Sequence, residues 1–106
     1  MPVVLVARYK VKPGNRPKVD EALHKMMALV KEREPACLQY QPHVSTEDPN
    51  AMLLYEVYQD QAALDAHGQT AYFKEHVLGT VVPLLASRER EFYTPLQSAK
   101  EPHTPR

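Results

Sequence analysis

Residues 51–58 read AMLLYEVY, and this stretch decides the fold. Glu56 is its only charged residue, and apolar or aromatic side chains stand at both odd and even positions. Because side chains alternate between the two faces of a strand, such a strand has no face suited to water. We therefore predict that residues 51–59 form a strand at the centre of a sheet or at an interface between molecules.

A second strand precedes this one along the chain. Residues 36–45 are a strand-like run, and the polar segment TEDPN at 46–50 separates them from residues 51–59. A loop of this length suits an antiparallel hairpin. The sequence therefore predicts that the two runs pair as antiparallel neighbours.

The N-terminal segment is another predicted strand. Residues 3–11, VVLVARYKV, are rich in β-branched and aromatic residues and end before the turn signal Pro13-Gly14. The odd positions of this run are all apolar or aromatic, whereas Arg8 and Lys10 stand at even positions. One face of this strand should therefore pack against a core.

Between the first two strands the apolar residues recur at the spacing of a helix. Asn15 is expected to cap this helix, and Pro35 is expected to end it near Arg33, because proline disfavours helical geometry in the residue before it. The apolar side of the helix consists of Val19, Leu23, Met26, Met27 and Val30.

A short helix is predicted to follow residue 59. Asp60 is its expected N-cap, and Gly68 is its expected C-terminal glycine, which leaves residues 61–67 for the helix itself. The sequence therefore predicts barely two helical turns directly after the hairpin.

The last predicted elements are a longer helix and a strand. The helix begins near Thr70, and Gly79 and Pro83 are expected to kink or divide it. Residues 87–94, which include the charged and aromatic run REREFY, are predicted to be the final strand.

The order of these elements predicts an α+β fold. A helix that follows the first and the third strand returns the chain across the sheet, which gives the ferredoxin-like split βαβ arrangement with a four-stranded antiparallel sheet. Both helical layers then cover one face and leave the other bare. A partly apolar bare face in so small a domain needs a partner, so we expect a homodimer with twofold symmetry.

Composition narrows the classes of function. The chain has 106 residues with 13 Lys+Arg and 13 Asp+Glu, so it has no excess of positive charge to attract nucleic acid. Its one cysteine, its lack of a recognisable secretion signal and its short apolar runs predict a cytoplasmic protein with no membrane partner. We expect one domain over 1–96 and a flexible tail over 97–106.

A family resemblance rests on residues 55–73. The segment resembles the signature of the antibiotic biosynthesis monooxygenase domain, in which a strand ending in Tyr-Glu leads to a helix with Ala-His and then to Ser/Thr-x-His-Phe. Tyr72 stands where that family usually has its second histidine. The residues that carry the resemblance are Tyr55-Glu56-Val57-Tyr58-Gln59-Asp60, Ala63-Leu64, Ala66-His67 and Thr70-Ala71-Tyr72-Phe73.

The resemblance implies a dimeric α/β barrel with one pocket in each subunit, between the sheet and the helices. It also implies a cofactor-independent monooxygenase that oxidises a small quinol or polyphenolic compound with O₂, so we expect no cofactor and no metal. Heme-degrading relatives share the fold, but this chain has no Trp for the helix position that they use. The three glycines, at 14, 68 and 79, form no phosphate-binding or dinucleotide-binding loop.

Candidate site residues follow from the resemblance and from the predicted faces. We predict that His67, near the end of its helix, removes a phenolic proton, with Tyr72 and His76 as further catalytic residues. Glu56 is expected either to orient His67 or to pair with an arginine of the last strand, because a buried carboxylate needs a partner. The predicted substrate-binding residues are Leu5, Tyr9, Glu56, Phe73 and Val77.

Two other functions fit the same sequence. One is an isomerase or degrader of a small oxygenated metabolite, in which the same histidine would move a proton between carbons. The other is a dimeric module that binds a small molecule or serves a stress response without catalysis.

Overall fold

Strand β1 (Val3–Val11) lies inside an antiparallel sheet and buries one face, as its alternating pattern predicts for that face. The structure is a computed structural model and describes residues 1–96, so the predicted tail lies outside the described residues. β1 pairs with β3 (Ala51–Tyr58) on one side and with β4 (Leu85–Tyr93) on the other. β2 (Cys37–Val44) completes the four-stranded sheet in the order β2-β3-β1-β4, which is the predicted ferredoxin-like topology.

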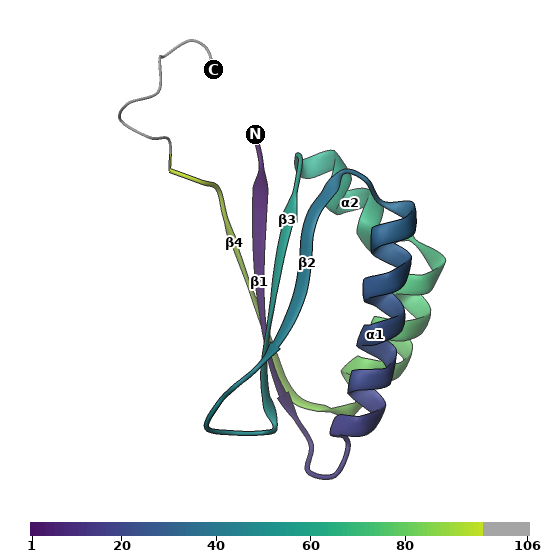
Figure 1. Ribbon diagram of the computed structural model, residues 1–106, viewed down its shortest axis with the longest axis vertical. Coiled ribbons are helices and arrows are strands. Elements are labelled where there is room, and N and C mark those ends of the chain that lie inside the picture. Colours follow the sequence, from purple (N-terminus) through teal and green to yellow (C-terminus); the bar gives the residue numbers. More distant parts are fainter. Residues whose placement is uncertain (97–106) are drawn as a thin grey trace.

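Helices cover one face of the sheet only, as Figure 1 shows. On that face β1 and β3 present side chains at alternate positions that are almost completely buried. The core there includes Ala7, Tyr9, Val11, Met52 and Leu54, packed with Val19, Leu23 and Val81 of the helical layer, while Leu5 packs with Tyr58 and Leu64.

The long helix α1 (Arg16–Arg33) has the predicted bounds but not the predicted cap. The Asn15 side chain does not accept from the helix; its Nδ2 donates to the carbonyl oxygens of Lys12 and Pro13 instead. Those bonds hold the turn in which Gly14 has a φ of 85°. The helix stops at Glu34, directly before Pro35, as predicted.

Helix α2 (Gln61–Gln69) begins as predicted and ends two residues later than predicted. The Asp60 carboxylate accepts a hydrogen bond of 2.9 Å from the Ala63 amide. Gly68 is not the glycine that ends the helix: it lies within α2 without a positive φ, and Thr70 is the C-cap. His67 therefore lies in the last helical turn and faces inward.

The segment after Thr70 is divided next to Pro83, as predicted, whereas Gly79 lies inside a continuous helical segment. Residues Phe73–Val81 form a π-helix, η1, and residues Val82–Leu84 form a 3₁₀ turn, η2. The wider π turn brings the Lys74 carbonyl oxygen within 3.3 Å of where a Cβ of Gly79 would be, so only glycine fits without a shift. Pro83 lies in the 3₁₀ turn, where the chain leaves the helix for β4.

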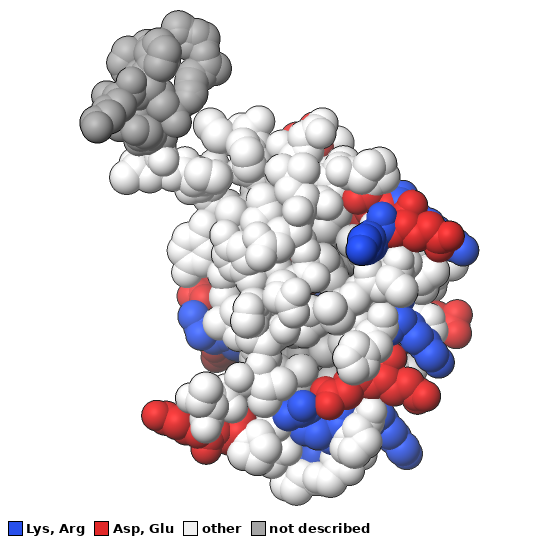
Figure 2. All heavy atoms as spheres, viewed as in Figure 1, with Lys and Arg blue, Asp and Glu red and all other residues white. Residues whose placement is uncertain are grey.

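Within residues 1–96, no helix covers the opposite face of the sheet (Figure 1). Its centre consists of the half-buried apolar residues Val4, Val6, Leu53, Tyr55 and Val57, flanked by an exposed ion pair between Arg8 and Glu91. Figure 2 shows most Lys, Arg, Asp and Glu over the helical side and at the hairpin end, a smaller charged group at the opposite edge, and a broad uncharged area between them. No helix among residues 1–96 combines the length and apolar character needed to cross a membrane.

Candidate functional site

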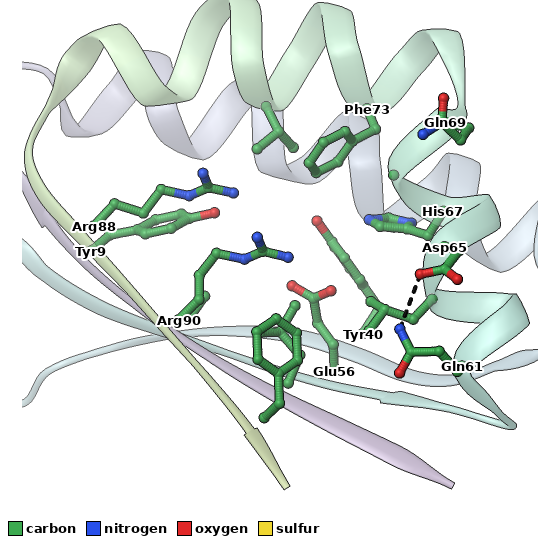
Figure 3. A pocket seen from close by; sticks show the side chains of 16 residues that line it. Tyr9, Tyr40, Glu56, Gln61, Asp65, His67, Gln69, Phe73, Arg88 and Arg90 are labelled. Carbon is green, nitrogen blue, oxygen red and sulfur yellow. Dashed lines mark hydrogen bonds between the residues drawn. The ribbon is translucent and has the colours of Figure 1, made fainter. Parts of the chain in front are cut away.

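A cavity of about 320 Å³ lies between the sheet and the helical layer (Figure 3). Strands β1, β2 and β3 form its floor, α2 and η1 form its roof, and the edge strand β4 forms one side. The volume lies at the small end of the range for ligand pockets. The cavity suits a molecule with one or two rings rather than a nucleotide-sized cofactor.

His67 lies at one end of this cavity and is only 3 % exposed. Three aromatic rings surround its imidazole: those of Tyr40, Tyr58 and Phe73, with centroids 5.6, 5.4 and 5.1 Å away. Helix α2 positions it because residue 67 follows Leu64 by three residues, so both side chains point toward the sheet.

Glu34 fixes the orientation of the His67 ring. Its two carboxylate oxygens lie 3.0 and 3.1 Å from His67 Nδ1, and the Tyr72 hydroxyl donates to the same carboxylate. The geometry assigns the proton to Nδ1, because an ionised carboxylate can only accept. Burial, and then the bond to Glu34, raise the pKa of Tyr72 to about 12. We call Glu34, His67 and Tyr72 the histidine end.

Sequence reasoning missed Glu34. From the sequence, Glu34 is only the residue before Pro35, at the point where the helix is expected to end. That position was the available signal, because a carboxylate just beyond a helix end is free to turn toward another element. Which element it meets depends on how α2 packs beside α1, and the local sequence does not determine this.

Glu56 lies on the cavity floor and is 4 % exposed. Its Oε1 accepts a hydrogen bond of 2.6 Å from the hydroxyl of Tyr58, two residues along the same strand face. Burial raises the pKa of Glu56, and the Tyr58 bond, His67 and the arginines of β4 offset part of that rise. Both predicted roles are therefore replaced: the hydrogen-bond partner is Tyr58, and Glu34 orients His67.

Two arginines of β4 lie at the other end of the cavity, beside Tyr9. Arg88 and Arg90 are opposite Tyr9 and Ala7 in the β1–β4 register, so both project from the helix-covered face, and Figure 3 shows them directed into the cavity. Burial raises the pKa of Tyr9 to about 12, so its hydroxyl stays protonated. We call Tyr9, Arg88 and Arg90 the arginine end. Sequence reasoning considered these arginines only as partners of Glu56.

The cavity brings together most of the predicted site residues. Tyr72 donates a hydrogen bond to Glu34 and does not line the cavity, and His76 lies in a separate hollow beside Lys18 and Lys25 of α1. The predicted residues that do line the cavity are Leu5, Tyr9, Glu56, His67, Phe73 and Val77.

The arrangement equips His67 to accept a proton inside the cavity. With Nδ1–H held by Glu34, Nε2 carries the lone pair, and the nearby carboxylate stabilises the positive charge that forms. Apolar walls from Leu5, Phe73 and Val77 complete the space around it. In the part of the chain that the structure describes, no three His, Cys, Asp or Glu side chains gather as metal ligands would.

Comparison with known proteins gives a consistent family. The model of the family described as antibiotic biosynthesis monooxygenase matches residues 2–77. An uncharacterized protein from Synechocystis sp. is 36% identical over 76 residues, which cover 72% of this chain and 51% of that protein. The chain thus spans about half the length of that curated relative.

Solved structures show the same fold. A candidate antibiotic biosynthesis monooxygenase from Caulobacter crescentus has a TM-score of 0.84 and 29% identity, with 91% of each chain covered. A second one, from Bacteroides thetaiotaomicron, has a TM-score of 0.83 and 25% identity, with 94% of each chain covered.

Proposed function

The chain belongs to the antibiotic biosynthesis monooxygenase family, and we propose that it is a cofactor-independent monooxygenase that oxidises a small quinol or polyphenolic compound with O₂. One observation carries this proposal: His67 lines a cavity while Glu34 holds the far side of its ring. An imidazole held in this way is suited to act as a general base.

A proton acceptor is what such a reaction needs from the protein. A free phenol, with a pKa near 10, is mostly protonated at neutral pH, and its anion gives up an electron far more readily. His67 Nε2 would take the phenolic proton, and the anion would pass one electron to O₂ to form superoxide and a substrate radical. These two combine to a ring-bound peroxide, which loses water and leaves a carbonyl oxygen on the ring.

This sequence of steps balances without a cofactor. One quinol and one O₂ give one hydroxyquinone and one water, so the substrate itself supplies all the electrons. The proton that His67 takes returns with the departing water. The apolar walls of Leu5, Phe73 and Val77 support this chemistry, because a dry cavity keeps the radical pair from solvent.

Oxygen uptake tests the proposal. Purified protein is incubated with a panel of quinols in the presence of a chelator while oxygen consumption and product absorbance are recorded. We expect one O₂ consumed per quinol at a rate well above the background oxidation. Proton exchange at carbon without oxygen uptake would favour the isomerase, and binding without turnover would favour the non-catalytic module.

We also propose that the bare face of the sheet pairs with a second copy of the chain. Its apolar centre at Val4, Val6, Leu53, Tyr55 and Val57 has no cover within the described part of the chain. Sedimentation at micromolar concentration should give twice the chain mass of 12.1 kDa. A monomer at that concentration would contradict the dimer and leave the cavity chemistry open to a separate test.

A further inference from the structure

We propose that the arginine end binds an anionic oxygen of the substrate, so that the substrate is a small aromatic acid whose carboxylate lies between Arg88 and Arg90. The inference rests on the proposed function, because it names the substrate class of the same cavity. It assigns a binding role to β4 that is separate from the proton transfer at His67.

The partner pattern of the arginines is the first argument. Arg8, Arg16 and Arg33 each form an ion pair with a carboxylate. Within residues 1–96, Arg88 and Arg90 form none, although both line the cavity, Arg88 as a half-buried residue and Arg90 as an exposed one. Among the arginines of residues 1–96, the two directed into the cavity are therefore the two without a carboxylate partner.

Burial of Arg88 is the second argument. Its Nε is buried and has no hydrogen-bond partner among the described residues. A buried N–H group of a cation that stays unpaired is costly, and native proteins rarely keep one without a reason. A carboxylate in the cavity would accept from this nitrogen and remove the cost.

The geometry of the edge strand suits a carboxylate. Residues 88 and 90 are alternate positions of β4, so both guanidinium groups project to the same side. The Arg90 guanidinium lies 5.1 Å from the ring centroid of Phe92, which helps to hold its direction. Guanidinium groups offer planar pairs of donors that match the two oxygens of a carboxylate, and the protonated Tyr9 hydroxyl adds a neighbouring donor.

Neither carboxylate that lines the cavity forms an ion pair with Arg88 or Arg90. Glu56 is engaged by Tyr58, and its raised pKa lowers its tendency to carry charge in competition with a ligand. Asp65 lies on α2, away from β4, where its carboxylate accepts from Gln61 (Figure 3). An acid at the arginine end would leave its ring against the apolar walls and its phenolic group toward His67.

Binding of matched ligands tests the proposal without turnover. The probes are gentisate, a quinol ring with one carboxylate, its neutral amide gentisamide, and plain hydroquinone. Calorimetry under nitrogen measures their affinities for the wild type, for Arg88→Gln and Arg90→Gln, and for the control Lys31→Gln. The control removes one positive charge at an exposed position of α1, outside this cavity.

We expect the wild type and the Lys31→Gln control to bind gentisate about 10-fold or more tightly than gentisamide, as charge-assisted hydrogen bonds allow. Either arginine substitution should remove most of that preference and leave the affinity for hydroquinone little changed. Equal affinities for acid and amide in the wild type would overturn the proposal, as would a preference that survives both arginine substitutions.

The outcome separates this inference from the oxygenase proposal. If gentisamide and hydroquinone bind as well as gentisate and all consume oxygen, the substrate-class inference is wrong and the oxygenase stands. If gentisate binds preferentially but no quinol consumes oxygen, the anion site stands and the oxygenase is wrong. Circular dichroism of each variant establishes that the fold is intact.

Discussion

At the histidine end of the cavity Glu34 joins His67 and Tyr72, whereas at the arginine end Arg88 and Arg90 have no carboxylate partner in the described chain. The histidine end is complete before any ligand arrives, so its groups are already oriented. At the arginine end, neither guanidinium forms an ion pair with a carboxylate of residues 1–96. On our two proposals, the histidine end is prepared for proton transfer and the arginine end for recognition of an anion.

The largest effect is expected from His67→Ala. The substitution removes the proposed base, so kcat should fall about 10²- to 10⁴-fold, as for the loss of a positioned general base. Oxygen uptake with the best quinol of the panel measures it, with His24→Ala on the exposed side of α1 as the control. His76→Ala tests the other histidine that the sequence nominated. Wild-type turnover in His67→Ala would remove the histidine end from the mechanism.

Glu34→Gln tests whether orientation matters as much as the base itself. Loss of the carboxylate charge should lower kcat about 10- to 100-fold while the KM changes little, as for other partners that orient a functional imidazole. Tyr72→Phe removes only one hydrogen-bond partner of the Glu34 carboxylate, so its kcat should fall less than that of Glu34→Gln. Steady-state kinetics of both variants provide the check, and an equal effect on KM and kcat in Glu34→Gln would indicate a general disturbance of the site instead.

Glu56→Gln tests the charge between the two ends. Because the pKa of Glu56 is raised above its ordinary value of 4.5, the folded protein holds this proton more tightly than the unfolded chain does. The resulting stability is fully present below pH 4.5 and is lost as the pH rises through the folded-state pKa. Urea unfolding between pH 4 and pH 8 should therefore show a steeper decline for the wild type than for Glu56→Gln, which keeps the oxygen that accepts from Tyr58. Parallel declines would contradict the assignment.

The smallest effect is expected from Arg88→Met. Because Arg88 Nε has no partner, replacing the guanidinium should change the free energy of unfolding by less than about 1 kcal/mol or should stabilise the chain. Glu34→Ala, at the satisfied end, should cost about 1–3 kcal/mol because it leaves two donors unpaired. Thermal unfolding of the two variants compares the ends directly, and a larger loss for Arg88→Met would reverse the comparison.

The sequence predicts the fold better than the site because the two depend on different information. The alternation in β1, the continuous apolar run in β3 and the break at Pro35 are local patterns, and they place the sheet and α1 correctly. The contact between Glu34 and His67 joins residues 33 positions apart in sequence, and it requires the relative placement of α1 and α2. The Gly68 prediction was wrong for a local reason: Thr70 is the C-cap, and its backbone N–H donates to the His67 carbonyl oxygen, so α2 continues past Gly68.

The position of β4 at the edge of the sheet has a consequence for how this protein can diversify. Arg88 and Arg90 lie beyond residue 77, where the family match ends, while Glu34 and His67 lie inside it. β4 pairs with a single neighbouring strand, so its outer residues can change without disturbing a second one. If His67 is the base and the β4 arginines bind an acid, as we propose, a change confined to the terminal strand would shift the preference from acidic to neutral compounds and leave Glu34 and His67 in place.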